Sequence, residues 1–373
     1  MKILAIETSC DETSAAIVEQ QTDGTITLIS QSTATSLQLH SRTGGIIPEV
    51  AAREQSKYII PVIQEVFEKA GLAFGKNKIP DINAIAVTYG PGLIGSLLVG
   101  VETAKTLSFV WNKPLIPVNH LFGHVYANWI TDFSLNKPSE SNNLNTAPAF
   151  PLIALIVSGG HTDLLLMKSH KDITWLGGTR DDAAGECFDK SGRVLGLSYP
   201  AGPAIEQKAT LGNPKAYRFP RPLLHDSAFD FSFSGLKTAV LREVQKLSSS
   251  SEQGESRSPQ QFSTSPNKNL PEQQINDICR GLQDAISDVL IKKTCNAAEK
   301  YNAKSIVLSG GVAANQTLKE AFIKKLEATD ITLFVPPKSL CTDNAAMIGA
   351  AAFFQGNKTE WSNVTANPEL YFD

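Results

Sequence analysis

Two histidines four residues apart, His120 and His124, form the pair in this sequence whose spacing most directly suggests chemistry. On a helix, positions i and i+4 share one face, so both imidazole rings could bind the same cation. The pair could equally serve packing, because Leu121 and Phe122 make this stretch apolar. A metal site needs a third ligand, and Asp343, just before an apolar run of small residues, could supply a carboxylate. The spacing indicates a candidate metal site and leaves a packing role open.

Three glycine-rich stretches could bring backbone N–H groups close to an anion, because glycine has no Cβ to keep a ligand away. They are GPGLIGSLLVG at 90–100, VSGGHT at 157–162 and LSGGVAANQTL at 308–318. The first resembles a dinucleotide-binding fingerprint only loosely, since no acidic residue follows its glycines at the usual distance. Any one of them could be a tight turn, but together they favour a phosphate site.

The elements that must position these residues follow a repeated pattern. The segments ILAIETSCDETSAAIVEQ, near the start, and LIALIVSGGHTDLLLMKS, about 150 residues later, each place a polar turn between two apolar strands. Such a segment predicts a β-hairpin whose tip offers N–H and hydroxyl donors. We also expect helices near 51–70, 93–110 and 271–300 and from Asn315, and strands at 82–90, 114–119 and 305–311. This alternation predicts an α/β chain with two similarly built halves.

Two segments poor in apolar residues mark the organisation of the chain. Residues 134–149 are rich in Asn, Ser and Pro and are predicted to form a linker, and residues 247–271 are predicted to be a flexible insertion. We therefore expect a first half at 1–133, completed by 343–373, and a second half at 150–342 that contains the insertion.

Composition limits the classes of protein to which the chain can belong. Its 373 residues are 42% hydrophobic and 19% charged, as in an ordinary globular protein. The start has no signal-peptide core, no segment approaches the ~18 apolar residues of a membrane span, and the five cysteines form no CxxC pair. We therefore expect a cytoplasmic protein that has no membrane partner.

A net charge of −3 argues against a dedicated duplex-binding protein, so contact with a phosphate-rich partner would have to come from a local patch. The best candidate is KAYRFPRP at 215–222, where Lys215, Arg218 and Arg221 are interleaved with two aromatic residues. A solvated loop with chance charges would show the same pattern, so the sequence leaves both interpretations open.

Eight motifs, in chain order, carry a resemblance to one family. They are ETSCDETS, GPGLIGSLLVG, NHLFGH, LIVSGGHT, AGECFDKSGRVLGLSYPAGP, FSFSGLKTAV, SGGVAANQTL and CTDNAAMIG. Together they resemble, over nearly the whole chain, the TsaD family of tRNA N6-adenosine threonylcarbamoyltransferases, formerly described as glycoproteases. The resemblance implies the two-domain fold of actin, Hsp70 and sugar kinases, in which duplicated mixed-sheet halves flank a central nucleotide cleft. It also implies transfer of a threonylcarbamoyl group from threonylcarbamoyl-AMP to the N6 amine of adenosine 37 of tRNA.

The resemblance gives the candidate metal site a role. His120, His124 and Asp343 match the family's ligands for one divalent metal, usually Fe²⁺ and sometimes Zn²⁺. Some relatives have a Tyr at the position of Ile156, so in this chain the remaining coordination sites would fall to substrate or water. Such a metal could hold carbonyl or phosphate oxygens as a Lewis acid.

The resemblance also implies a set of substrate contacts. They are Ile156 and Val157 with the phosphate loop Ser158, Gly159 and Gly160; Asp189 and Glu206 at ribose hydroxyls; and Gly202 and Asn315 elsewhere on the nucleotide. Many bacterial relatives have Asp in place of Glu206, and the extra methylene could shift that contact.

Loss of the proton from the adenine amine needs a base, and Glu12, in the first polar turn, is our candidate. Its alternative role is a solvated carboxylate at a hairpin tip. His161 is a rival base, although its place in the second turn suits ligand contact or packing equally well. Cys10 and Cys187 have no paired base for thiolate chemistry. HLFGH also lacks the Glu of the zincin helix motif, which argues against a peptidase.

Two other classes of protein share the expected cleft. An actin-like ATPase or sugar-kinase-type phosphotransferase would not need the paired histidines, and an actin-like nucleotide-gated scaffold would not need catalysis. The transferase interpretation implies more partners: the tRNA anticodon loop, a TsaB-like paralogue and a TsaE-like small ATPase. We expect the paralogue to contact an apolar helical face of the first half.

Overall fold

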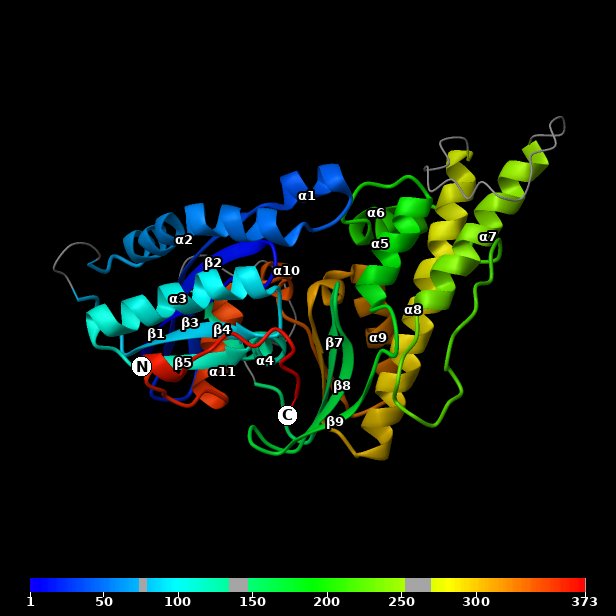
Figure 1. Ribbon diagram of the computed structural model, residues 1–373. Coiled ribbons are helices and arrows are strands. Elements are labelled where there is room, and N and C mark those ends of the chain that lie inside the picture. Colours follow the sequence, from blue (N-terminus) through cyan, green and yellow to red (C-terminus); the bar gives the residue numbers. More distant parts are fainter. Residues whose placement is uncertain (74–78, 134–146, 252–269, 373) are drawn as a thin grey trace.

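The computed structural model describes residues 1–73, 79–133, 147–251 and 270–372. Within these residues the chain folds into two mixed β-sheets, each packed against helices (Figure 1). The strands of the first sheet are β1 Lys2–Glu7, β2 Glu12–Gln20, β3 Ile26–Thr35, β4 Ala84–Gly90, β5 Leu115–Asn119 and β6 Ile130–Phe133. Those of the second sheet are β7 Leu152–Val157, β8 Thr162–Met167, β9 Ile173–Gly178, β10 Ser305–Ser309 and β11 Thr332–Phe334.

The two sheets repeat one arrangement of strands. The first has the order β5-β4-β1-β2-β3-β6, and the second has the order β11-β10-β7-β8-β9. In each sheet three consecutive strands pair antiparallel, and two later strands join in parallel beside the first of the three. Both expected hairpins are therefore confirmed, because β1 pairs with β2 and β7 pairs with β8. The expected similarity of the two halves is confirmed as well.

Helices cover both sheets and also separate them. The helices are α1 Leu37–Thr43, α2 Pro48–Lys69, α3 Ile94–Trp111, α4 His120–Tyr126, α5 Ala184–Val194, α6 Gly202–Ala209, α7 Ser234–Ser251, α8 Glu272–Lys300, α9 Gln316–Leu326, α10 Lys338–Cys341 and α11 Ala345–Phe354. Short 3₁₀ turns lie at Ala127–Trp129, Gly311–Ala314 and Trp361–Asn363. The helices expected near 51–70, 93–110 and 271–300 are α2, α3 and α8. Helix α2 begins earlier, at Pro48, because proline suits the first turn of a helix.

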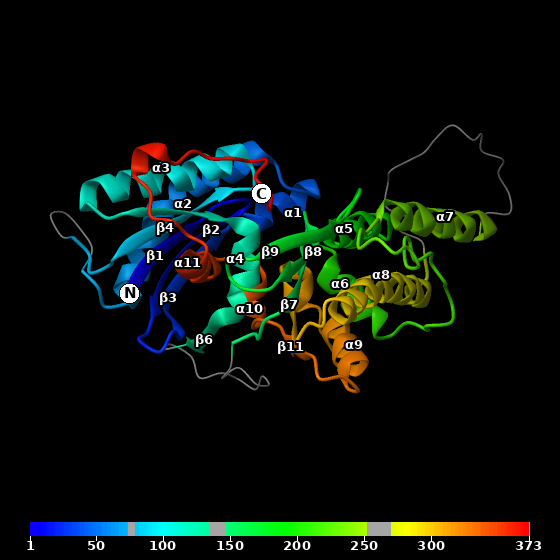
Figure 2. The ribbon, with the colours of Figure 1, turned by 90° about the horizontal axis from the view of Figure 1, so that it is seen from below.

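Alternation along the central strands sends their side chains into different cores. In β1, Leu4 packs with α2 and α3, whereas Ile3 packs with α4 and α11. In β7, Ile153 packs with α5 and α8, whereas Leu152 joins the same core as α4 and α11. Successive strand residues face opposite sides, so both faces of these strands are apolar and buried. As a result α4 and α11 lie in a core that both sheets share (Figures 1 and 2).

Gly349 lets α11 lie against the first sheet. A Cβ at this position would be 2.3 Å from Cγ2 of Val18 and 3.2 Å from Cβ of Ala5. Even alanine would therefore push the helix away from β1 and β2. This close approach matters for the site below, because Asp343 lies just before α11.

The low-apolar segments give a mixed outcome. Helix α7 continues to Ser251, with Val244 buried and Leu247 packed against the core between the second sheet, α5 and α8, so the expected insertion at 247–271 begins too early. Residues 252–269 of that insertion and 134–146 of the expected linker lie outside the described residues. The expected domain limits stay a prediction.

Among the described residues, none of the helices combines the length and the apolar character that a membrane span requires.

Candidate active site

Helix α4 begins at the end of β5 and presents both histidines on one side. Asn119 caps it, because the side-chain oxygen of Asn119 accepts a hydrogen bond from the N–H of Leu121 at 2.8 Å. The rings of His120 and His124 lie with centroids 4.6 Å apart and planes at 79°. Both side chains are almost wholly buried. The spacing in the sequence therefore produces the expected pair on one helical face.

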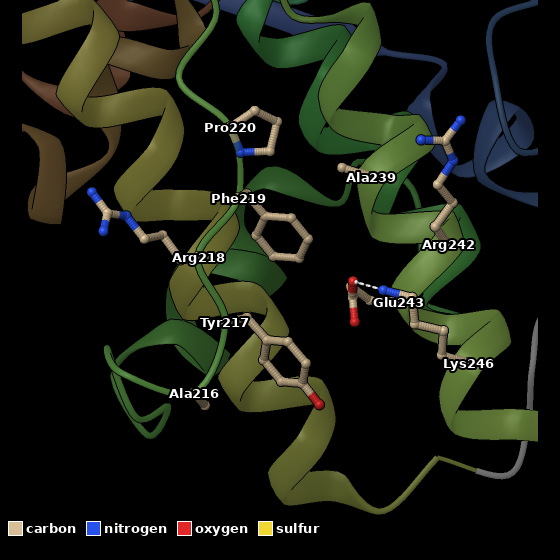
Figure 3. A pocket seen from close by; sticks show the side chains of 9 residues that line it. All are labelled: Ala216, Tyr217, Arg218, Phe219, Pro220, Ala239, Arg242, Glu243 and Lys246. Atoms are coloured by element: carbon tan, nitrogen blue, oxygen red, sulfur yellow. Dashed lines mark hydrogen bonds and ion pairs between the residues drawn. The ribbon is translucent and has the colours of Figure 1, made fainter. Parts of the chain in front are cut away.

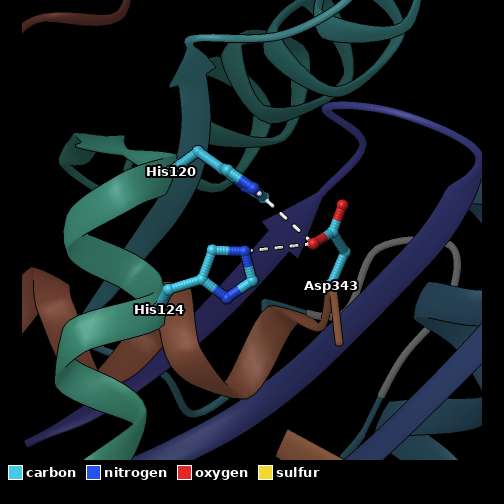
Figure 4. A group of neighbouring side chains, drawn as sticks. All are labelled: His120, His124 and Asp343. Carbon is cyan, nitrogen blue, oxygen red and sulfur yellow. Dashed lines mark ion pairs between the residues drawn. The ribbon is translucent and has the colours of Figure 1, made fainter. Parts of the chain in front are cut away.

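Asp343 reaches the histidine pair from the turn between α10 and α11. Its Oδ1 is 3.2 Å from Nε2 of His124 and 3.6 Å from Nε2 of His120 (Figure 4). The next residue, Asn344, caps α11 by accepting a hydrogen bond from the N–H of Met347 at 2.9 Å, which fixes the turn. The proximity expected from the sequence is confirmed, although more than 200 residues separate the carboxylate from the imidazoles.

The three side chains fit a divalent metal. Their ligand atoms all lie within 4.8 Å of one another. Both ring nitrogens of His124 are buried, and within the described part of the chain neither makes a well-directed hydrogen bond; the polar contact of Nε2 is the ion pair with Asp343. Buried polar atoms normally have such partners, so an unsatisfied imidazole beside a carboxylate suits a ligand role. Two imidazoles and one carboxylate bind Fe²⁺ or Zn²⁺ and leave further positions open.

Two residues of the first half contact the outer nitrogen of His120. Nδ1 of His120 is 3.1 Å from Oε2 of Glu7 and 3.2 Å from Oγ of Ser9. The carboxylate of Glu7 also accepts hydrogen bonds from the hydroxyl of Thr88 and from the N–H of Ser9, and it is wholly buried. Sequence reasoning missed Glu7. Its signal was a charged residue that directly ends an apolar strand, where a buried carboxylate needs partners.

The charges of the cluster act on one another. Burial alone would lower the pKa of His120, but the carboxylates of Asp343 and Glu7 outweigh it and raise that pKa to about 9. Burial alone would raise the pKa of Asp343, but His120 and His124 hold it well below its usual range. Burial, together with the charge of His120, lowers the pKa of His124. The two histidines are buried, whereas the Asp343 side chain is 21% exposed, so the cluster can be reached from outside on the carboxylate side.

The two candidate bases differ in their electrostatic surroundings. Glu12 begins β2, and burial together with the charges of Asp343 and Asp11 raises the pKa of its carboxyl well above the usual range. Burial and the two nearby imidazoles lower the pKa of His161 to about 4. Both groups therefore belong to the electrostatic neighbourhood of the cluster. A base that works near neutral pH needs a raised carboxyl pKa, which favours Glu12 over His161.

The tip of the second hairpin is open to a ligand. A Cβ at Gly159 or Gly160 would meet no atom within 4 Å. Ser158 fixes the turn, because its N–H donates to the carbonyl of His161 at 2.8 Å and its hydroxyl accepts from the N–H of His161 at 3.1 Å. The side chains of Ile156 and Val157 are wholly buried, so any contact there would come from the backbone.

The remaining expected contacts lie on α5, α6 and α9 and already have protein partners. Oδ1 of Asp189 accepts a hydrogen bond from the N–H of Ala201 at 2.7 Å, next to Gly202 at the start of α6. Oε1 of Glu206 accepts from the N–H of Thr317 at 3.1 Å, at the start of α9. Asp189 therefore ties α5 to the start of α6, and Glu206 ties α6 to the start of α9.

Asn315 has a structural role of its own. It caps α9 by accepting a hydrogen bond from the N–H of Leu318 at 2.8 Å, and its amide group pairs with that of Gln283. Its side chain is buried. These bonds could have been expected from the sequence, because Asn is a preferred residue at a helix start.

The cysteines near the motifs have high pKa values. Burial and the charge of Asp343 raise the pKa of the Cys10 thiol well above its usual range, and burial raises that of Cys187 to about 12. A raised pKa disfavours the thiolate, which is the nucleophilic form of cysteine, at neutral pH. This agrees with the expectation from sequence that the chain does not use thiolate chemistry.

Comparisons with solved structures give the class of fold. HypF of T. kodakarensis aligns with a TM-score of 0.55 at 13% identity, covering 94% of this chain and 47% of that one. Full-length HypF in its phosphate- and nucleotide-bound form aligns with a TM-score of 0.53 at 12% identity, covering 94% and 54%. With the repeated strand order of the two sheets, these likenesses confirm an actin-like α/β fold that carries a buried His–His–Asp cluster.

Sequence comparisons give the family within that class. A sequence model described as TsaD, tRNA N6-adenosine threonylcarbamoyltransferase, matches residues 27–350. The transferase of that name from Thermomicrobium roseum is 47% identical over 95% of this chain and 92% of its own length. That from Moorella thermoacetica is 44% identical over 99% and 96%. The chain belongs to the TsaD family. It is therefore a tRNA-modifying acyltransferase rather than an actin-like ATPase, sugar kinase or scaffold.

Proposed function

We propose that the chain transfers the threonylcarbamoyl group of threonylcarbamoyl-AMP to the N6 amine of adenosine 37 in tRNA, beside His120, His124 and Asp343. The amine nitrogen attacks the carbamoyl carbon, the bond from that carbon to the phosphate oxygen breaks, and AMP leaves. The observation that carries the proposal is the cluster of two buried imidazoles and one carboxylate, with Nε2 of His124 3.2 Å from Oδ1 of Asp343. In a member of this family, such a cluster is the group best suited to hold an activated acyl donor.

One divalent metal, Fe²⁺ or alternatively Zn²⁺, would be held by His120, His124 and Asp343. When bound, such an ion supplies a Lewis acid for oxygens of the donor. The protein supplies the orientation of its ligands. Glu7 accepts from Nδ1 of His120 and so leaves Nε2, which faces Asp343, free to bind.

The phosphate of the donor would lie at the second hairpin tip. Gly159 and Gly160 leave open space there, so their N–H groups can approach a phosphate closely. Ser158 supports the turn. Ile156 and Val157 would contribute their backbone alone, since their side chains are in the core.

The nucleoside would lie between α5, α6 and α9. Gly202 has open space around it, because an added Cβ would meet no atom within 4 Å. Asp189 and Glu206 each use one carboxylate oxygen for a helix start, which leaves the other oxygen for a ribose hydroxyl. Asn315, buried and paired with Gln283, would position the start of α9.

Glu12 would accept the proton that leaves the adenine amine. Its raised pKa, caused first by burial and then by Asp343 and Asp11, makes it a stronger base than an ordinary carboxylate. A neutral His161, with a pKa of about 4, would be the weaker acceptor. The donor already has a good leaving group, so alignment of the amine and this proton transfer are what the protein must add.

The proposed protein partners are a TsaB-like paralogue and a TsaE-like small ATPase, with the anticodon loop as the substrate. Support for a paralogue comes from apolar side chains that the first half exposes on α2 and α3. They are Tyr58, Ile60, Ile94, Leu98, Phe109 and Val110. Exposed apolar side chains of this size favour a protein interface on that face. A tRNA substrate supports the cytoplasm as the compartment.

The direct test is modification of unmodified tRNA. The purified chain, with and without the two partners, is incubated with threonylcarbamoyl-AMP and tRNA, and the digested RNA is analysed by nucleoside mass spectrometry. Wild type should form threonylcarbamoyladenosine, and His124→Ala should not. His225→Ala, at an exposed histidine, is the matched control and should behave as wild type. Full modification by His124→Ala would overturn the proposal.

A further inference from the structure

A cleft of about 510 Å³ lies between the segment 216–220 and helix α7 (Figure 3). It is lined by Ala216, Tyr217, Arg218, Phe219, Pro220, Ala239, Arg242, Glu243 and Lys246. Helices α7 and α8 lie on the opposite side of the second sheet from α4 (Figure 1). The cleft is therefore separate from the His–Asp cluster, and the proposed chemistry does not use it.

The wall formed by residues 216–220 is fixed in place. It lies close against α8 because Gly281 has no side chain: a Cβ there would be 2.7 Å from the carbonyl oxygen of Tyr217. Arg221 ties the segment down, donating to the carbonyl of Phe219 at 2.6 Å and to Asp288 on α8 at 3.0 Å. A wall held at both points keeps its shape when a ligand binds, which lowers the entropic cost of binding.

Two aromatic rings project from this wall toward α7 (Figure 3). The rings of Tyr217 and Phe219 are nearly parallel, at 15°, with centroids 6.3 Å apart. Phe219 is buried and supports the wall, whereas Tyr217 is only partly buried. Tyr217 therefore offers a rigid ring on which a planar group can stack.

Cationic side chains surround the rings. Arg218 and Arg242 are exposed, and among the described residues neither has a carboxylate within 4.0 Å. Lys246 is 2.7 Å from Glu243, the acidic residue that lines the cleft. The whole chain carries a net charge of −3, whereas the residues that line this cleft have an excess of positive charge. The cleft should therefore attract anions.

We propose that this cleft binds a single-stranded stretch of the tRNA substrate, with a base on Tyr217 and phosphates on Arg242 and Arg218. Guanidinium groups suit phosphates, and an aromatic ring beside them suits an unpaired base. An acidic peptide would use the same charges but would have no use for the ring. The inference rests on the proposed function for its RNA. Because the cleft is separate from the reacting groups, it contributes to tRNA affinity and not to the chemical step.

Binding of fluorescently labelled, unmodified tRNA to the full chain tests the cleft directly. Arg242→Gln and Tyr217→Ala should each weaken binding roughly five- to tenfold. Arg242→Gln should also reduce the slope of log affinity against log salt by about 0.7, the value for one single-strand phosphate. Glu243→Gln should strengthen binding, because it removes the negative charge that lines the cleft. Tyr217→Phe, which keeps the ring, should bind more tightly than Tyr217→Ala.

Modification kinetics separate this inference from the proposed function. In the complete system the Arg242 and Tyr217 variants should raise KM for tRNA and leave kcat and KM for threonylcarbamoyl-AMP unchanged. Lys324→Gln, at an exposed lysine on α9, is the control for loss of one positive charge elsewhere. If wild type forms no product, the proposed function fails, and the binding assay alone decides the cleft. Unchanged tRNA affinity in both variants, or loss of polyglutamate binding without loss of tRNA binding, would overturn the inference.

Discussion

Oε2 of Glu7, at the end of β1, lies 3.1 Å from Nδ1 of His120, at the start of α4. A carboxylate oxygen accepts a hydrogen bond, so Nδ1 of His120 is the donor, and a metal ion would take the place of the proton on Nε2. Nε2 faces Asp343 and His124. One buried carboxylate of the first hairpin thus sets the tautomer of a proposed metal ligand.

Glu7→Gln tests this relationship. The amide can donate as well as accept, so His120 would no longer be held in one tautomer. We expect metal affinity to fall by about 10- to 100-fold, as is typical when an outer partner of a ligating histidine is lost. Calorimetric titration of the metal-free protein with Zn²⁺ measures this affinity. Glu49→Gln, at an exposed glutamate on α2, is the control. An unchanged affinity would show that Glu7 serves folding alone.

Much of this site could be predicted because its parts are local in sequence. The hairpins follow from apolar runs around a short polar turn, and the pairing of His120 with His124 follows from helical spacing. Asp343 could be named from the sequence as a candidate third ligand, but no spacing rule joins residues so far apart, and the family resemblance was needed to place it with the histidines. The contact between Glu7 and His120 also joins residues far apart in the sequence. It depends on how the ends of β1 and β5 align in the sheet, which no local pattern reveals.

Other parts were harder to predict because tertiary contacts decide them. Asp189 and Asn315 are predicted nucleotide contacts, and in the structure both side chains hold helix starts. Helix α7 runs into a serine-rich stretch that composition alone marks as unstructured, because Leu247 still packs against the core between the second sheet, α5 and α8. Composition indicates only whether a segment as a whole can bury apolar surface. A single apolar residue at the right position can extend a helix into a segment that is polar on average.

Gly349→Val tests how the position of α11 controls the site. The added side chain would enter the space of Val18, since even a Cβ would be 2.3 Å from it. We expect the free energy of unfolding to fall by about 1–3 kcal/mol, as for other overpacked cores. Metal affinity should fall too, because Asp343 precedes this helix. Urea denaturation and metal titration measure both, with Gly235→Ala, at an open position on α7, as the control. Unchanged stability would contradict the packing argument.

The pH dependence of the reaction tests Glu12. A base must be deprotonated, and burial with the charges of Asp343 and Asp11 raises the pKa of this carboxyl. Activity should therefore fall as the pH drops through that raised pKa and be complete above it. Glu12→Gln should lower kcat by about 100-fold or more and remove this acidic limb. If Glu12→Gln still showed the fall in activity at low pH, another group would be the base.

The C-terminal segment offers a further test, because it lies beyond the residues matched by the family. The hydroxyl of Tyr371 donates to the buried Asp163 on β8, and the carbonyl of Tyr371 accepts from Asn119, the cap of α4, at 2.7 Å. Tyr371→Phe would remove this hydroxyl donor and leave Asp163 with the hydrogen bond from the indole N–H of Trp175 at 3.1 Å. We expect a loss of about 1–3 kcal/mol in the free energy of unfolding. Tyr58→Phe, at an exposed position, should cost nothing measurable.

The proposed chemistry depends on an ion held by His120, His124 and Asp343, and elemental analysis of the purified chain tests for this ion most directly. After reconstitution with Fe²⁺ or Zn²⁺ and removal of free ions, wild type and His225→Ala should each retain about one ion per chain, as expected for a single three-ligand site. His124→Ala and Asp343→Ala should retain almost none while staying folded by circular dichroism. Equal metal content in wild type and both ligand variants would contradict the account.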